Sequence, residues 1–223
     1  MTWPLEYLGS SIGKKQVLAV SGLMLCIFLI VHLSGNLLIL VGPEAFNTYA
    51  HTLATNPFIT VAEISLAMVF LTHIILAIKI TMENQAARPQ EYFLKRPTGR
   101  GATFASSSMP YTGLIILIFL ILHLIHFRFG KAPMVDYHGV AMRDLHVLVM
   151  DLFKKPLYVF WYIFAQVSLG VHLSHGFSSA FGTLGLHHPK YTPLIKKLGI
   201  VFAIIIAAGF STISIWAYLQ GGK

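Results

Sequence analysis

The chain has 223 residues, of which 56% are hydrophobic and only 11% charged, and its formal net charge is +8. Few soluble domains carry so few charges, so the composition indicates a polytopic membrane protein and leaves little chain for a soluble domain. The basic residues fall between apolar segments. This placement argues against nucleic-acid binding and for a role in topology, in contact with anionic lipid or in binding an acidic partner.

Five apolar segments are long enough to cross a bilayer, which takes roughly 20 residues of helix. They cover about residues 16–41, 58–81, 110–129, 156–180 and 193–219. We therefore expect an all-α protein with one membrane domain over residues 1–223 and loops over 42–57 and 130–155. Prolines 57, 110, 156 and 193 lie near the expected helix starts, where a missing N–H costs little.

The distribution of basic residues predicts the orientation in the membrane. If the amino terminus is cytoplasmic, ten lysine and arginine residues lie inside and six outside. The positive-inside rule favours this arrangement. Cys26 is the only cysteine. The chain by itself therefore has no disulfide, no thiolate iron–sulfur site and no C-x-x-C-H motif for covalent haem attachment.

A histidine interrupts each of the first four apolar segments, at His32, His73, His123 and His172. An ionisable side chain in hydrocarbon is costly and indicates a functional site. At about 1.5 Å per residue, His32 and His123 lie roughly 20–24 Å from the inner face, and His73 and His172 roughly 22–24 Å from the outer face. The spacing predicts an outer pair, His32 with His123, and an inner pair, His73 with His172, about 15 Å apart along the membrane normal.

Two imidazoles at one depth on different helices can ligate one flat metal macrocycle from both sides. Bis-imidazole haem b is the standard chemistry of this kind. We therefore expect the first four helices to form a haem-binding bundle with two haems b. Gly22 and Gly113 each lie ten residues before the histidine of their own segment, at the expected level of the inner pair. There they either make room for the inner haem or only allow close helix contact.

Glu63 is the carboxylate that lies within a predicted span, ten residues before His73 and so at the expected level of the outer pair. A partly buried carboxyl can exchange protons with a redox substrate such as a quinone. The run from Thr60 to Glu63 also matches a capping box at the start of the second helix. Both interpretations stay open at this point.

Four stretches of the chain resemble a known family. They are SSIGKKQVLAVSGLMLCIFLIVHLSGN from Ser10, FLTHIILAIK from Phe70, TGLIILIFLILH from Thr112 and VHLSHGFSSAFGTLGLHHPKY from Val171. Together and in this order, they resemble the single-chain, five-helix, di-haem cytochrome b anchor of bacterial succinate dehydrogenase and fumarate reductase. The resemblance covers nearly the whole chain.

The resemblance implies a function and a set of partners. Such an anchor carries two haems b, which maps the axial ligands onto His32, His73, His123 and His172. It binds a quinone, usually menaquinone, in the bacterial cytoplasmic membrane. On the cytoplasmic side it docks an iron–sulfur subunit that carries a flavoprotein, where the succinate or fumarate chemistry takes place. Some members have an acidic residue two positions before the fourth ligand; this chain has Gly170 there.

Three other functions compete with this interpretation. A transporter or channel would use the histidines as a proton relay. A membrane metalloenzyme of the histidine-box kind would need several ligands at one level. The di-haem cytochrome b of a hydrogenase or formate dehydrogenase shares the cofactor but not the motif order. The colour of the purified protein and its reduced-minus-oxidised spectrum separate the haem proteins from the other two classes.

Overall fold

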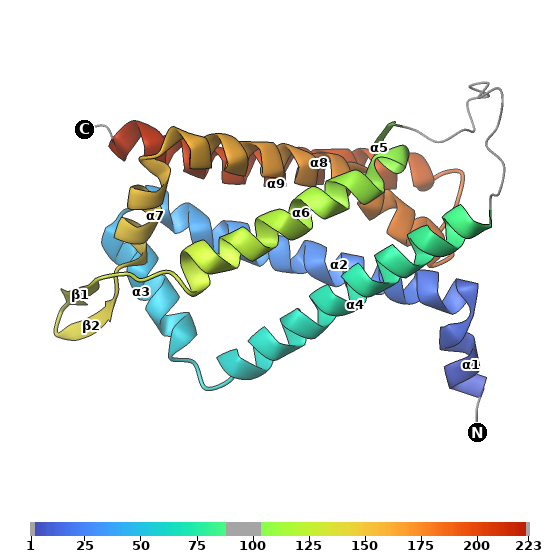
Figure 1. Cartoon of the computed structure of the whole chain (residues 1–223), viewed down its shortest axis with the longest axis horizontal. Coiled ribbons are helices and arrows are strands. Elements are labelled where there is room, and N and C mark those ends of the chain that lie inside the picture. The colour runs from blue at the N-terminus through green and yellow to red at the C-terminus, as the bar shows by residue number, and fades with distance from the viewer. Residues whose placement is uncertain (1–2, 88–103, 222–223) are drawn as a thin grey trace.

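The computed structural model describes residues 3–87 and 104–221. Five long helices run along the molecule, and each is long and apolar enough to span a membrane (Figure 1). They are α2 (Ser11–Asn36), α4 (Ile59–Ala86), α6 (Met109–His123), α8 (Pro156–Thr183) and α9 (Thr192–Gly221). The prediction of an all-α, multi-pass membrane protein with five spans is therefore confirmed.

Two of the spans continue in a different helical form. α2 passes into the 3-10 helix η1 (Leu37–Leu40), and α6 passes into the π-helix η2 (Leu124–Arg128). The π-helix begins directly after His123. Wider helical turns of this kind occur frequently at functional sites.

Two span boundaries differ by five residues from those expected, and the others differ by three or fewer. α2 begins five residues early, because the Ser10 side chain caps it by accepting a hydrogen bond from the Gly13 N–H at 3.1 Å. α4 continues to Ala86 instead of ending at 81, because no proline or glycine interrupts it. Glu83 therefore also lies within a candidate span, and the prediction that Glu63 is the sole carboxylate in a span was wrong.

The two expected loops contain regular structure. Residues 42–57 include helix α3 (Pro43–Ala54), and residues 130–155 include strands β1 (Met134–Tyr137) and β2 (Val140–Arg143) and helix α7 (Leu145–Phe153). The strands form an antiparallel hairpin that turns at His138 and Gly139, both with positive φ, as a tight two-residue turn requires.

A buried amide joins these connecting elements. Asn47 of α3 is 0% exposed; its Nδ2 donates to Asp144 Oδ1 at 2.9 Å, and its Oδ1 accepts from the His146 N–H at 2.9 Å. Asp144 also caps α7 by accepting from the Val147 N–H. The same polar group therefore starts α7 and holds it against α3.

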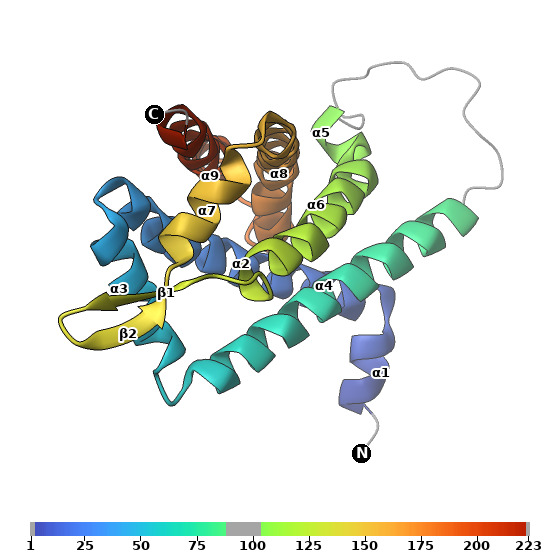
Figure 2. The same ribbon diagram turned by 60° about the vertical axis from the view of Figure 1, so that its left-hand side comes forward.

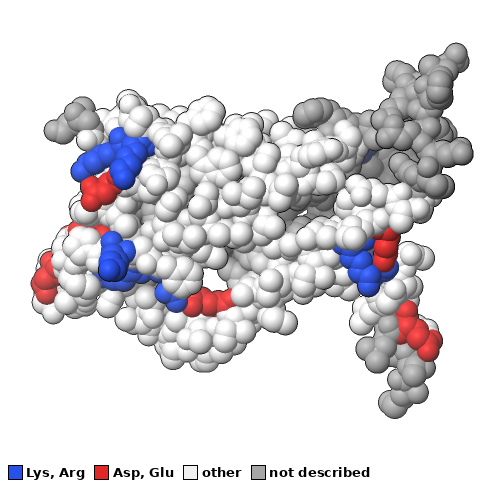
Figure 3. Space-filling view, in the orientation of Figure 1, with Lys and Arg blue, Asp and Glu red and all other residues white. Residues whose placement is uncertain are grey.

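The elements divide between two ends of the bundle (Figure 1). One end carries α3, the β-hairpin, α7 and the end of α9, and we call it the hairpin end. The other carries α1 (Trp3–Gly9), α5 (Phe104–Ser107) and the connection from α8 to α9, and we call it the amino-terminal end. Charged side chains gather mainly toward these two ends, and most of the visible face between them is uncharged (Figure 3).

The spans are packed unequally. α8 and α9 lie side by side (Figure 2), and α9 buries Ala203, Ile206 and Ala217. α2, α4, α6 and α8 form a ring in which each helix contacts its neighbours, and α9 lies against α8 and α2. α4 has no buried residue in the described structure, so it is the most loosely held span.

Candidate functional site

The structure brings the four intramembrane histidines together in the two pairs that the sequence suggested. The ring centroids of His32 on α2 and His123 on α6 are 5.8 Å apart. Those of His73 on α4 and His172 on α8 are 6.5 Å apart. Each pair therefore joins two helices of the four-helix ring, and their role as metal ligands stays a prediction.

The spacing within each pair fits a metal ion held between the rings. Metal–imidazole bonds are about 2.0–2.1 Å long, so a metal ligated from both sides holds the two ring centroids roughly 6 Å apart. Both observed centroid distances lie close to this value. The Nδ1 atom of His123 is buried and has no hydrogen-bond partner among the described residues, so this nitrogen is left unsatisfied.

Aromatic rings surround the outer pair. Phe28 stacks on His32 at 5.1 Å between centroids, and Phe210 of α9 lies 5.6 Å away. Phe119 and Phe127 flank His123 at 5.5 Å and 5.2 Å. Such a lining is apolar and flat-sided, which suits a planar apolar cofactor better than a hydrated ion.

Two glycines face the inner pair. A Cβ atom placed on Gly22 of α2 would lie 3.2 Å from His73 Cε1, and one placed on Gly113 of α6 would lie 3.7 Å from His172 Cε1. Both glycines thus lie at the level predicted from their ten-residue spacing. Each glycine makes room for the imidazole that it faces, because a larger side chain at Gly22 would meet the His73 ring.

Glu63 is bound to an arginine. Its Oε2 accepts a hydrogen bond from Arg128 Nη2 at 3.1 Å, and the two side chains are about half exposed. The capping-box interpretation was wrong, because α4 begins at Ile59 and no side chain caps it. Arg128 lies five residues beyond His123, at the last position of η2. Glu63 is therefore at the end of the bundle that holds the outer pair.

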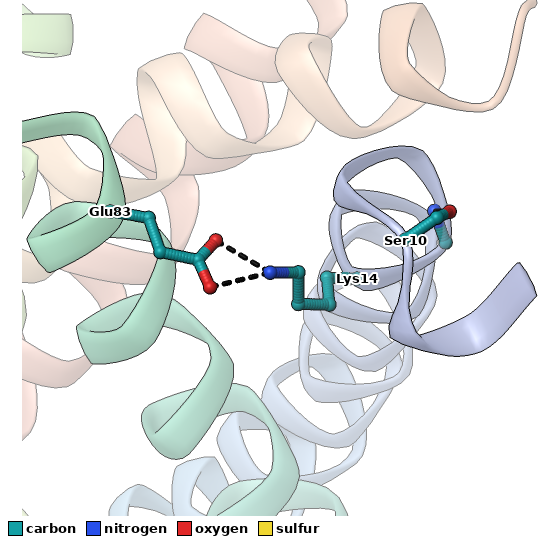
Figure 4. Close-up of polar contacts among 4 residues, drawn as sticks. Ser10, Lys14 and Glu83 are labelled. Atoms are coloured by element: carbon teal, nitrogen blue, oxygen red, sulfur yellow. Dashed lines mark hydrogen bonds and ion pairs between the residues drawn. The ribbon is translucent and has the colours of Figure 1, made fainter. Parts of the chain in front are cut away.

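A second ion pair lies at the amino-terminal end, between α2 and α4. Lys14 Nζ donates to both carboxylate oxygens of Glu83, at 2.5 and 2.6 Å (Figure 4). The Lys14 side chain is 11% exposed, so a positive charge that is largely removed from solvent has a counter-ion. This pair explains how Glu83 is tolerated near the end of a largely apolar helix.

The sequence interpretation missed three polar partners of the histidines. Ser21 and Thr112 lie 3.2 Å from the Nδ1 atoms of His73 and His172, and the Tyr162 hydroxyl lies 2.9 Å from His126 Nδ1. The residue spacing in the sequence could have identified these three partners. Ser21 and Thr112 directly precede the two glycines that were singled out. Tyr162 precedes His172 by ten residues, as Glu63 precedes His73.

Two further observations bear on the alternatives. Among the described residues, no three histidine, cysteine, aspartate or glutamate side chains come close enough to hold a metal ion, which a histidine-box site requires. Gly170, where some anchors have an acid, faces α9 closely: an added Cβ would lie 3.0 Å from the Ala207 Cβ. The tight α8–α9 contact therefore leaves no space for a longer side chain.

Comparison of the chain with protein-family models, with curated proteins and with solved structures finds no match. The functional argument therefore depends on the residues and their geometry, together with the motif resemblance described above.

Proposed function

We propose that this chain is the membrane anchor and di-haem electron-transfer subunit of a succinate:quinone oxidoreductase. His32 and His123 would ligate one haem b, and His73 and His172 the other. One observation carries the proposal: four histidines in four spans meet as two pairs at metal-bridging distance. Bound haem would supply one-electron transfer between the partner subunit and quinone.

The proposal places the partners at the amino-terminal end. With this end in the cytoplasm of a bacterium, the inner pair is nearest to a docked iron–sulfur subunit, which in turn carries the flavoprotein. The basic character of Lys14 and Lys15 and of the connection after α8 supports this orientation. We expect the docking face to be formed by residues 1–15, 82–109 and 181–197. Of these, residues 1–2 and 88–103 lie outside the described residues. The dicarboxylate active site would belong to the flavoprotein, so this chain is the quinone-reactive part of the enzyme.

Quinone, expected to be menaquinone, would bind beside the outer pair at the hairpin end. Glu63 would exchange a proton with the quinone there, and its ion pair with Arg128 supports this by holding the carboxylate near the end of the helix that carries His123. The outer pair is the far end of an electron path from the cytoplasmic partner. A quinone in this position would exchange electrons with the partner through both haems.

The first prediction is the haem content. The purified complex should give two haems b per chain in a pyridine haemochrome assay. His73→Ala and His172→Ala should each leave about one haem, because removing one ligand of the inner pair spares the outer pair. His138→Ala is the matched control, because this histidine lies in the exposed hairpin turn, and it should retain two.

A wild-type content of one haem contradicts the di-haem proposal, and a protein without haem contradicts it and favours a proton-conducting role. The class of oxidoreductase is tested separately, by assaying succinate–quinone and quinol–fumarate activity in the same preparation. A di-haem protein that lacks both activities and copurifies with hydrogenase or formate dehydrogenase subunits would leave the haem assignment standing and overturn the assignment to succinate and fumarate chemistry.

A further inference from the structure

Two buried hydroxyls face the inner pair from helices that carry the outer pair. Ser21 of α2 is 5% exposed, and its Oγ lies 3.2 Å from His73 Nδ1. Thr112 of α6 is 7% exposed, and its Oγ1 lies 3.2 Å from His172 Nδ1. The arrangement is the same on both sides of the inner pair. In both cases a hydroxyl oxygen lies next to Nδ1 of the ring, and the glycine that follows in the sequence faces Cε1 of the same ring.

The direction of these hydrogen bonds follows from the hydroxyl protons. A hydroxyl has one proton to donate, and Ser21 Oγ donates it to the Leu18 carbonyl at 2.9 Å. Thr112 Oγ1 donates to the carbonyls of Ser108 and Met109, at 3.1 and 3.2 Å. When the hydroxyl protons are used in this way, both oxygens accept hydrogen bonds from the rings, which requires the tautomer with the proton on Nδ1. The other nitrogen of a neutral imidazole, Nε2, then has a free lone pair.

We propose that Ser21 and Thr112 are positioning residues of the inner pair. Each accepts the Nδ1–H bond of one histidine, fixes the tautomer and rotation of the ring, and directs the Nε2 lone pair toward the metal position. This inference rests on the proposed function for the identity of the metal group. It goes beyond that function by assigning two side chains on α2 and α6 to the control of ligands on α4 and α8.

The outer pair lacks this support. His123 Nδ1 has no partner among the described residues, and Asn36 Nδ2, a donor, lies 3.4 Å from His32 Nδ1. An imidazole whose N–H donates a hydrogen bond is a more basic ligand. A more basic ligand favours the oxidised, more positive iron. Removing the hydroxyls should therefore raise the midpoint potential of the inner haem and leave the outer haem unchanged.

The test is a potentiometric titration of the purified complex, followed by haem absorbance, for Ser21→Ala, Thr112→Val and the double variant. One of the two redox components should rise by about 59 mV, the equivalent of a tenfold change for one electron. The component that His73→Ala removes identifies the inner haem. Ser214→Ala is the matched control, because Ser214 is 3% exposed and its hydroxyl donates to the Phe210 carbonyl without facing an imidazole of the inner pair.

Variants that keep the hydroxyl group show whether Ser21 and Thr112 act by positioning the imidazoles or only by filling space. Ser21→Thr and Thr112→Ser should keep the wild-type potential, or restore the inner haem if the first variants lose it. Two bound haems with unshifted potentials in the double variant would overturn the inference and leave the proposed function intact. Loss of the inner haem that the hydroxyl-retaining variants fail to restore would also overturn it. A wild-type protein without haem would instead overturn the proposed function itself.

Discussion

Glu63 and Arg128 form an ion pair between α4 and the end of η2, near the outer pair. We expect Glu63→Gln to keep both haems and complex assembly, because glutamine can still accept a hydrogen bond from Arg128. Quinone-linked activity should fall by about 10²-fold or more, since glutamine cannot exchange a proton. The measurement is quinone-dependent turnover at constant haem content.

Glu44→Gln is the control for this variant, because Glu44 is an exposed carboxylate at the same end that pairs with His138. It should have wild-type turnover. If Glu63→Gln also keeps full turnover, Glu63 has only a structural role with Arg128, and the proton acceptor lies elsewhere.

Gly22 offers a separate test of whether the inner pair holds a bulky group. A leucine at Gly22 would extend toward the His73 ring from a Cβ already 3.2 Å from Cε1. We expect Gly22→Leu to reduce haem content from two to about one. Gly113→Ala should have little effect, because its Cβ would make ordinary contact at 3.7 Å. Two haems with normal spectra in Gly22→Leu would favour the close-helix interpretation of both glycines.

At the residue scale, the sequence was sufficient to pair the histidines but not to find their neighbours. The level of His32 or His172 depends only on the helix rise and the span boundaries, which hydropathy sets. The contacts of Ser21, Thr112 and Arg128 depend on how adjacent helices are rotated and tilted. Helix packing determines those angles, and the sequence of a single helix does not contain them.

α4 is the span whose attachment depends most on polar contacts. It has no buried residue in the described structure, and in lipid the hydrophobic effect does not hold helices together. Its polar contacts occur every ten residues: Glu63 with Arg128, His73 with Ser21, and Glu83 with Lys14. The first and third contacts are ion pairs at the two ends of the helix.

This arrangement predicts that α4 loosens locally when an end contact is lost. Lys14→Ala should speed backbone hydrogen exchange in the last turns of α4, near Glu83, and leave exchange in α8 and α9 unchanged. The combination Lys14→Glu with Glu83→Lys should restore slow exchange, because the pair is re-formed with reversed charges. Unchanged exchange in Lys14→Ala would show that the ion pair contributes little to holding the helix.

The sequence analysis identified the long helices but missed α3, α7 and the hairpin. The bilayer imposes a length and an apolar composition on every span, so hydropathy alone detects them. The connecting elements are short and only partly apolar, and their position depends on tertiary contacts such as the buried Asn47 amide. Such contacts do not appear in a pattern of hydropathy.

At the scale of the whole molecule, the odd number of spans places the two chain termini at opposite ends of the bundle (Figure 1). The hairpin end and the amino-terminal end therefore face opposite sides of the membrane. The charge distribution predicts that the amino-terminal end is cytoplasmic. A membrane-impermeant maleimide should label Lys131→Cys in intact spheroplasts and label Lys190→Cys only after permeabilisation. Cys26 is 7% exposed and should give little background. The reverse labelling pattern would show that the topology is inverted.

The repeated hydroxyl–glycine dipeptide has one more consequence, which concerns how the chain can change over evolution. α2 and α6 each carry one histidine of the outer pair and one glycine that faces the inner pair, with ten residues from the glycine to the histidine. The number of residues between them thus sets the distance between the two sites. One inserted residue would turn His32 by about 100° away from His123, whereas seven inserted residues would keep its face and add about 10.5 Å. Substitutions can change the two pairs separately, but the distance between the pairs along the helices changes only by insertion or deletion. Under the proposed function, this is the distance that an electron would cross.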